Sequence, residues 1–356
     1  VVELQRAWDD GDAVLPIDQR LPADAKELLI DRLGAGVVVE PGGRTPRRGL
    51  PVETDDALVI ATSGTTGDPK GVILTHQAVA ASAEITTSAL AVDAADHWLA
   101  CLPIAHVGGL SVITRALLTG TGLTVLESFS GHAVEDAARN GATLVSLVVT
   151  TLRRIDPSLF RVILLGGSAI PIDRPSNTVA TYGMTETGSG IVYEGYPLAG
   201  VELDIDDGEV LVQSPTLLRA YRDGTVPVDG QGWFRTGDAG SLDADGRLRV
   251  FGRMGDVIVT GGEKVWPAQV ERVLGGLSWV GEVAVIGKPD EEWGERVVAV
   301  VAVAAGCAPP TLQAMREELQ DVLPRYALPR ELEIRDRLPL TALGKVRKAG
   351  LLDGDR

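Results

Sequence analysis

The chain has 356 residues, of which 45% are hydrophobic and 23% charged, so it can bury more than one core and is not disordered as a whole. Its 33 basic and 49 acidic residues give a net charge of −16, which excludes a broadly basic surface of the kind that binds nucleic acid or anionic membrane. A local basic cleft for an anionic substrate remains compatible with this charge.

The sequence contains no apolar run of 18 residues and no basic region followed by an apolar segment and a cleavage site. We therefore expect a cytoplasmic protein without membrane insertion. The two cysteines, Cys101 and Cys307, lie far apart and fit neither a disulfide framework nor a zinc site. They are expected to be buried, reduced thiols.

The first elements in chain order are an expected helix over residues 23–33 and a strand over 37–39, which together resemble an αβ repeat. Residues 41–48 are rich in Gly, Pro and Arg and predict a loop. Two apolar runs, 58–61 and 72–74, predict strands on either side of a glycine-rich segment.

An α/β sheet is predicted for the next part of the chain. Residues 76–90, 109–118 and 134–140 have helical patterns. Apolar runs of strand length alternate with them, at residues 98–102, 123–126, 144–149 and 162–165. Alternation of this kind is typical of helices packed on a sheet.

From residue 201 the sequence pattern changes and predicts short strands joined by turns. Residues 240–242 and 247–251 flank an Asp-Gly turn and predict a hairpin, and residues 209–213 predict another strand. A domain boundary is expected near Gly252. Beyond it, the end of a helix over 270–274, strands over 283–286 and 297–303 and a helix over 312–323 predict a compact α+β unit.

The segment between the two predicted strands at 58–61 and 72–74 is suited to phosphate, because its glycines, hydroxyls and lysine can surround anionic oxygens. Its phosphate-compatible residues are Thr62, Ser63, Gly64, Thr65, Thr66, Gly67 and Lys70. A Walker A loop would place Gly-Lys-Ser/Thr at the start of a helix, whereas here Pro69 precedes the lysine and a β-branched run follows. The segment is therefore a strand–loop–strand, and a P-loop NTPase is excluded.

This loop resembles the phosphate-binding signature of the adenylate-forming superfamily, and four further motifs of that family follow in order up to Lys345. They are Gly166-Gly167-Ser168-Ala169, Tyr182-Gly183-Met184-Thr185-Glu186, Thr236-Gly237-Asp238 with the later Arg253, and the segment from Pro339 to Lys345. The resemblance implies a large N-terminal domain of α/β sheets with a small distorted β-barrel (1–252), a hinge (253–256) and a small mobile α+β domain (257–356).

Site roles follow from the same resemblance. Glu186 would hold Mg²⁺ beside the catalytic Thr185, and Tyr182, Gly183 and Met184 would line the adenine site together with Gly166, Gly167 and Ser168. Asp238 and Arg253 would hold the ribose. Lys345 would bridge the acid and the α-phosphate, because attack of one anion on another needs neutralisation and placement more than acid–base catalysis.

Taken one by one, several of these residues have ordinary explanations. Asp238 could end a turn, Glu186 could take part in helix capping, and Lys345 could be a surface lysine. It is the order and spacing of the motifs that favours the functional assignment.

The segment 260–267, with Gly261, Gly262 and Glu263, resembles the pantetheine tunnel of acyl-CoA ligases, which implies CoA as the second substrate. Glycine suits such a tunnel because a thin arm must pass close to the backbone. Gly255 stands where the family usually has Asp or Lys at the hinge. Only 61 residues precede the phosphate loop, so the N-terminal subdomain is expected to be short.

Compact forms like this resemble o-succinylbenzoate–CoA ligases of menaquinone biosynthesis. The resemblance implies an acyl pocket lined by His106, Val107, Gly108, Arg115, Gly167 and Thr187. His106 is also a candidate catalytic residue, and the alternative is a buried imidazole with satisfied hydrogen bonds. Arg115 is expected either to pair with a second carboxylate of the substrate or to lie on a helix surface.

The expected activity is an AMP-forming acid–CoA ligase that uses ATP, Mg²⁺ and CoA. A free-standing adenylation enzyme that loads a carrier protein and a non-catalytic acyl-adenylate binder stay open as alternatives. A homodimer also stays open.

Overall fold

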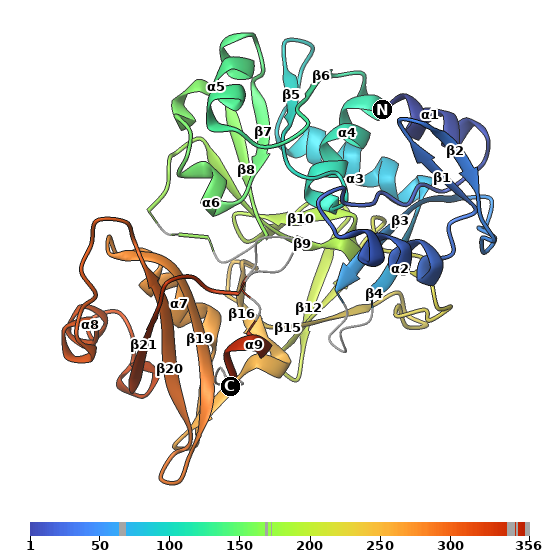
Figure 1. Cartoon of the computed structure of the whole chain (residues 1–356). Coiled ribbons are helices and arrows are strands. Elements are labelled where there is room, and N and C mark those ends of the chain that lie inside the picture. Colours follow the sequence, from blue (N-terminus) through green and yellow to red (C-terminus); the bar gives the residue numbers. More distant parts are fainter. Residues whose placement is uncertain (64–68, 168–169, 172, 340–345, 347, 353–356) are drawn as a thin grey trace.

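The computed structural model describes residues 1–63, 69–167, 170–171, 173–339, 346 and 348–352. The described chain forms five β-sheets. Four of them lie in a larger part, coloured blue to yellow in Figure 1, and the fifth lies in a smaller C-terminal part in orange and red. No helix among the described residues is long and apolar enough to cross a membrane.

The first segment contains the helices α1 (Val2–Asp9) and α2 (Ala23–Leu33) and the antiparallel hairpin of β1 (Val37–Glu40) and β2 (Gly43–Pro46). The expectation of a loop over 41–48 was wrong for residues 43–46, which pair with β1 across the short turn at residues 41–42. The αβ repeat was also wrong, since β1 joins this hairpin and not the large sheet.

The phosphate-loop strands are β3 (Asp56–Ser63) and β4 (Pro69–Thr75), which pair antiparallel and confirm the predicted strand–loop–strand. The short strand β14 (Ala220–Tyr221) lies on the other side of β4. Residues 64–68, which follow β3 and precede β4 in the sequence, lie outside the described residues.

The largest sheet has seven strands in the order β11-β10-β9-β8-β7-β5-β6. Five of them are parallel, namely β5 (His97–Ala100), β6 (Gly122–Val125), β7 (Leu144–Leu147), β8 (Val162–Leu165) and β9 (Thr178–Met184). Two antiparallel strands, β10 (Ser189–Tyr193) and β11 (Tyr196–Pro197), complete one edge. The predicted α/β sheet is confirmed.

Both faces of this sheet are buried, as parallel strands require. Trp98 and Leu164 face a core that includes residues of α3 (His76–Ala89) and α4 (Val107–Thr119). Leu99 and Ile163 point the other way, toward a second core with α5 (Gly131–Arg139). The short helix α6 (Val149–Leu152) follows β7.

The strand-and-turn region forms a four-stranded antiparallel sheet, in the place where the resemblance implied a small distorted barrel. Its order is β12 (Glu202–Asp206), β13 (Glu209–Gln213), β15 (Phe234–Leu242) and β16 (Leu248–Arg253). The predicted Asp-Gly turn joins β15 to β16, and the Asp243 carboxylate accepts the backbone N–H groups of Asp245 and Arg247.

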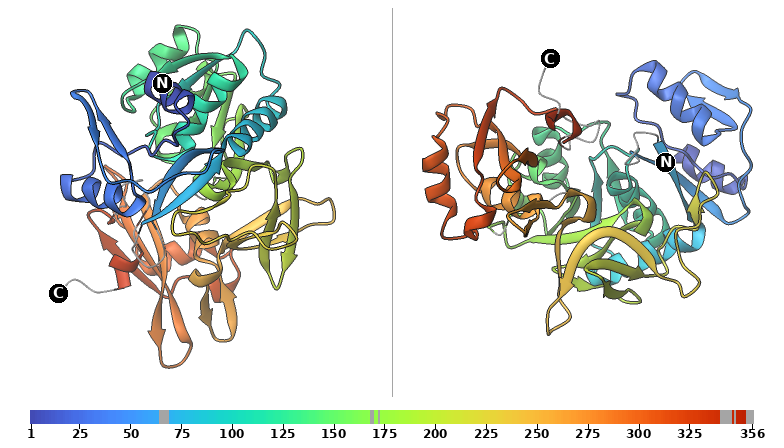
Figure 2. Two further views of the ribbon diagram at one scale, coloured as in Figure 1. Left: turned by 90° about the vertical axis from the view of Figure 1, so that its right-hand side faces the viewer. Right: turned by 90° about the horizontal axis from the view of Figure 1, so that it is seen from below.

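The C-terminal part has its own sheet, drawn in orange and red on the left of the right-hand view in Figure 2. Its elements are β17 (Ile258–Thr260), β18 (Glu263–Val265), α7 (Pro267–Leu274), β19 (Val280–Asp290), β20 (Gly294–Val303), α8 (Leu312–Leu319), β21 (Glu331–Arg335) and α9 (Ala349–Leu352). The helix α8 ends at Leu319 and not at the expected residue 323, because Val322 N–H donates to Leu319 O three residues back, in a turn that replaces the α-helical bond pattern. Of the two cysteines, Cys101 is buried as expected, whereas Cys307 is exposed.

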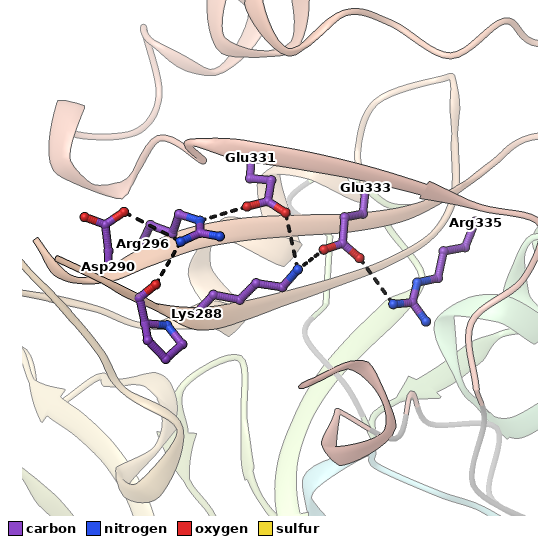
Figure 3. A network of polar contacts seen from close by, with 7 residues as sticks. Lys288, Asp290, Arg296, Glu331, Glu333 and Arg335 are labelled. Carbon is purple, nitrogen blue, oxygen red and sulfur yellow. Dashed lines mark hydrogen bonds and ion pairs between the residues drawn. The ribbon is translucent and has the colours of Figure 1, made fainter. Parts of the chain in front are cut away.

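A network of ion pairs joins β21 to β19 and β20 (Figure 3). Lys288 lies between Glu331 and Glu333, and Arg296 Nε donates to the second oxygen of Glu331 at 2.8 Å. The hydrogen bond from Arg296 and then that from Lys288 hold the pKa of the Glu331 carboxyl below its ordinary value of 4.5. The network therefore stabilises the sheet while Glu331 is ionised.

Replacing Glu331 with glutamine is expected to lower the free energy of unfolding by about 1 kcal/mol at pH 7. A lowered folded-state pKa gives a stabilisation that is present above the unfolded pKa and lost as the pH falls through the folded value. The urea midpoints of the two full-length proteins should therefore differ at pH 7 and converge near pH 3. Glu317→Gln, on the exposed face of α8, serves as the control, and a gap that persists unchanged at pH 3 would contradict the ionic origin.

Candidate functional site

The glycines after β8 begin the site, at the carboxyl ends of the parallel strands, where α/β sheets commonly bind ligands. The Gly166 N–H donates to Leu147 O, and a Cβ at Gly166 would lie 2.5 Å from the Thr181 hydroxyl. Gly167 has a φ of +82°, which other residues rarely adopt. Close packing and left-handed backbone thus account for both glycines, and Ser168 lies outside the described residues.

Tyr182, Asp238 and Arg253 meet although they come from three strands of two sheets. The Tyr182 hydroxyl donates to Asp238 Oδ2 at 2.9 Å, and Arg253 Nε lies 3.1 Å from Asp238 Oδ1. Burial and then the charge of Asp238 raise the pKa of Tyr182, so the phenol stays protonated and can donate. Asp238 is almost fully buried, whereas Arg253 is largely exposed and can turn toward a ligand.

A tight turn fixes Asp238 in this position. The Thr236 hydroxyl donates to Val210 O and accepts the Asp238 N–H, and Gly237 has a φ of +70°. Arg253 Nη1 donates to Thr236 O at 2.8 Å. The Thr-Gly-Asp motif therefore presents a rigid carboxylate with an arginine beside it.

Glu186 lies in the single 3₁₀ turn Thr185–Thr187, directly after Gly183 and Met184 of β9. Gly183 is required by packing, since a Cβ there would lie 2.1 Å from Ser189 O. Thr187 has no exposed surface, and its hydroxyl bonds to Met184 and Ser189 backbone groups. The structure thus places Thr187 inside the turn that carries Glu186, and its expected position on the wall of an acyl pocket stays a prediction.

Tyr221 was missed by the sequence analysis and connects two predicted site residues. Its hydroxyl donates to Glu186 Oε1 at 3.1 Å, and the Lys70 ammonium lies 5.0 Å from the centre of its ring. A two-residue strand gives no periodic pattern, so the aromatic residue had no signal of its own. Lys70 and Glu186 are thereby brought to one place.

The described residues include no group of three or more His, Cys, Asp or Glu side chains that could hold a metal ion. Glu186 therefore offers a single carboxylate. That donor set fits Mg²⁺ when a substrate supplies phosphate oxygens, because Mg²⁺ is commonly held by one or two carboxylates together with phosphates and water.

The predicted acyl-pocket residues lie around the start of α4. His106 is its N-cap residue, and Val107 and Gly108 begin the first turn. A Cβ at Gly108 would meet nothing within 4 Å, whereas one at Gly109 would lie 2.4 Å from Pro103 O. The buried Asp18 lies near this corner: the hydrogen bond from Arg20, and to a smaller extent the charge of His106, lower the pKa of its carboxyl.

Arg115 lies on α4 and is only 1% exposed, so the expectation of a helix-surface residue was wrong. Its guanidinium lies 4.7 Å from the centre of the Trp98 ring. No described residue accepts a hydrogen bond from its Nε or Nη1 atoms. Burial lowers the pKa of this arginine, because a charged group is costly to keep in an apolar core.

Gly261 and Gly262 form the two-residue turn of the hairpin β17–β18, with φ angles of +58° and +83°, and exposed Glu263 follows. Two consecutive positive φ angles require a turn of the kind that Gly-Gly supplies. A Cβ at Gly261 would also lie 2.7 Å from the Trp293 ring. The glycines are thus explained by the hairpin itself, independently of any tunnel.

Residues 254–256 form one 3₁₀ turn between β16 and β17. Gly255 has no positive φ, and a Cβ there would meet nothing within 4 Å. This arrangement of the chain does not require glycine at position 255.

The predicted Lys345 lies outside the described residues, as do Gly64, Thr65, Thr66 and Gly67. The chain on either side of Lys345 is anchored on the C-terminal sheet. Leu338 and Leu351 belong to the core on one face of β19 and β20, and Lys348 Nζ lies 2.8 Å from Glu271 Oε1. The two parts of the molecule also touch, because Arg153 Nη2 donates to Gly275 O at 2.8 Å.

Each of the two parts of the chain matches the model of a known protein family. The model of the AMP-binding enzyme family matches residues 6–222, and that of the AMP-binding enzyme C-terminal domain matches residues 269–345. A probable 2-succinylbenzoate–CoA ligase of Mycobacterium tuberculosis is 37% identical over 332 residues, which cover 86% of each chain.

Two solved structures of o-succinylbenzoate CoA synthetase from Bacillus subtilis are each 28% identical to the chain and cover 99% of it and 81% of their own length. One holds the acyl-adenylate intermediate and superposes with a TM-score of 0.80. The other holds ATP and a magnesium ion, with a TM-score of 0.78.

Proposed function

The chain belongs to the family of AMP-binding enzymes and is an AMP-forming acid–CoA ligase, and we propose that its acid is 2-succinylbenzoate, activated at the site described above. In the first step a carboxylate oxygen of the acid attacks the α-phosphorus of ATP, and the bond to the β-phosphate breaks to release pyrophosphate. In the second step the CoA sulfur attacks the acyl carbon, the bond to AMP breaks, and the thiol proton is lost.

We propose that Asp238 accepts hydrogen bonds from the two ribose hydroxyls, with Arg253 beside it and the Tyr182 ring against adenine. The rigid Thr236–Asp238 turn and the two bonds on the Asp238 carboxylate support this role. Gly166, Gly167, Gly183 and Met184 would line the adenine side of the same nucleotide site.

Bound Mg²⁺ would neutralise charge on the phosphates. We propose that Glu186 holds it, on the strength of the single carboxylate at the 3₁₀ turn and of Lys70 nearby. Lys70, with the hydroxyls and backbone of the phosphate loop, would bind the phosphates themselves. Thr185 would contribute its hydroxyl from the same turn.

We also propose that Lys345 approaches the acid and the α-phosphate from the C-terminal domain, and that residues 253–256 are the hinge that moves this domain between the two steps. The described conformation does not require glycine at position 255. The backbone freedom of Gly255 would then be needed in a second arrangement of the two domains, which the hinge reaches during the reaction cycle. Gly261, Gly262 and Glu263 would border the path of CoA.

The choice of acid depends on one observation, the buried guanidinium of Arg115 whose Nε and Nη1 have no acceptor among the described residues. The acid 2-succinylbenzoate has two carboxylates, so one remains charged while the other is adenylated. A buried arginine with two donors that lack an acceptor among the described residues would be stabilised by that remaining carboxylate. Val107, Ser111 and Thr114 of the same helix line a small cavity, and His106 is the N-cap residue of that helix.

Replacing Arg115 with methionine tests the choice of acid. We expect kcat/KM for 2-succinylbenzoate to fall about 10²-fold or more, the effect of removing one partner of a buried charge pair. The analogue 4-oxo-4-phenylbutanoate lacks the ring carboxylate and benzoate lacks the succinyl chain. At least one of these mono-acids should change by less than about 3-fold.

Thermal stability is the control for this experiment. Methionine keeps an apolar side chain against Trp98 and removes a buried charge that has no anionic partner among the described residues, so the melting temperature of the free enzyme should not fall. Equal losses with all three acids together with a lower melting temperature would instead assign Arg115 a purely structural role.

A further inference from the structure

Tyr221 holds the carboxylate of Glu186 and the ammonium of Lys70 from one strand position. The hydroxyl bond to Glu186 Oε1 is 3.1 Å long, and Lys70 Nζ lies 5.0 Å from the ring centre, within the range of a cation–π contact. The three residues come from β14, the turn after β9 and β4. Tyr221 is therefore the contact between a single carboxylate and a lysine that are far apart in the sequence.

The backbone around Tyr221 is tied to the same two elements. Leu218 N–H donates to Glu186 O at 2.8 Å, so residues 218–221 contact both the backbone and the side chain of Glu186. Tyr221 pairs with Val72 of β4, and Arg222 N–H donates to Gly71 O. The segment 218–222 thus bridges the turn of Glu186 to the strand of Lys70.

Two arginines fix this segment in place. Arg219 pairs with the buried carboxylate of Asp56 through Nε at 2.8 Å. Arg222 donates to three backbone carbonyl groups, those of Leu33, Leu50 and Pro51. An aromatic side chain with two rotatable bonds on such a rigid segment has little freedom, so its hydroxyl position is well defined.

We infer that Tyr221 is a positioning residue for the adenylation step, which orients the Glu186 carboxylate for the divalent cation and keeps the Lys70 ammonium beside it. The hydroxyl uses one lone pair of Oε1 and leaves the others for a cation. Partners of this kind orient a ligating carboxylate, and their loss commonly weakens metal binding 10–100-fold. The inference rests on the proposed role of Glu186 as the magnesium ligand.

The hydroxyl and the ring have separable roles. Tyr221→Phe removes the bond to Glu186 and keeps the ring under Lys70, so it should weaken binding of the cation alone. Tyr221→Leu removes both contacts and should also weaken the grip on the phosphates. Tyr196→Phe is the matched control, because Tyr196 is half exposed on β11 and lies near Arg247.

Binding is measured without turnover, by titrating Mn²⁺ into the full-length protein with α,β-methylene-ATP and following free Mn²⁺ by electron paramagnetic resonance. We expect the Kd for Mn²⁺ to rise about 10-fold in Tyr221→Phe, while the Kd for the nucleotide without metal stays unchanged. Tyr221→Leu should raise the nucleotide Kd several-fold as well. Tyr196→Phe should match the parent protein.

Glu186→Gln tests the proposed metal ligand separately from the positioning role of Tyr221. If this variant binds Mn²⁺ poorly and Tyr221→Phe binds it normally, the positioning role is overturned and the metal ligand stands. If Glu186→Gln binds Mn²⁺ as the parent does, the ligand assignment itself fails. Where both assignments hold, Tyr221→Phe added to Glu186→Gln should cause no further loss, since the two changes remove one connected unit.

Discussion

Replacing Lys345 with alanine is expected to lower the rate of acyl-adenylate formation 10²–10⁴-fold, which corresponds to about 3–5 kcal/mol of barrier. The attacking carboxylate and the α-phosphate repel one another, and the ammonium would neutralise both as they approach. Thioester formation from supplied acyl-adenylate should stay within a few-fold of the parent rate, because no phosphoryl transfer remains. The two rates are measured separately, as pyrophosphate release and as thioester formed from the synthetic adenylate.

Lys348→Ala is the matched control for this prediction. Lys348 follows closely in the chain and pairs with Glu271 on the helix α7, so its loss should leave adenylation within a few-fold of normal. An equal fall of both half-reactions in Lys345→Ala would show that the lysine acts on folding or on the second step as well.

Replacing Asp238 with alanine is expected to lower kcat/KM for ATP about 10²–10³-fold. The change removes the proposed acceptor of two ribose hydroxyls and also leaves Arg253 Nε and the Tyr182 hydroxyl without the bonds seen here. Because the ribose contact is equally strong before and during reaction, most of the effect should appear in KM and little in kcat. Initial rates at varied ATP and saturating acid measure the two parameters.

Asp245→Ala, in the exposed turn between β15 and β16, controls for general damage to that sheet. A fall in kcat with an unchanged KM would contradict the proposed ribose contact.

The strands of the large sheet could be predicted because their burial on both faces produces short, continuous apolar runs, as at residues 162–165. The strand–loop–strand of the phosphate loop followed from local residues alone. β2 could not be found, because its sequence Gly-Arg-Thr-Pro has no apolar pattern and all four residues are exposed. Its pairing with β1 depends on the turn, not on burial.

The site was predicted residue by residue from its motifs, but the contacts that connect those residues were not. The bond from Tyr221 to Glu186 spans 35 positions and comes from a two-residue strand. Arg115 is a similar case: charged residues are mostly exposed, so its sequence position on a helix favoured the surface as much as a pocket. Its burial against Trp98 depends on the tertiary structure. The sequence by itself does not indicate a ligand that would balance the charge.

The most direct test of the account is one time course with ATP, Mg²⁺, CoA and 2-succinylbenzoate, in which pyrophosphate, AMP and the acyl-CoA thioester are quantified together by mass spectrometry. We expect the three products to form in equal amounts, and pyrophosphate without thioester to stop near one equivalent of enzyme when CoA is left out. Release of ADP and phosphate instead of AMP and pyrophosphate, or turnover of ATP without thioester in the complete mixture, would contradict it.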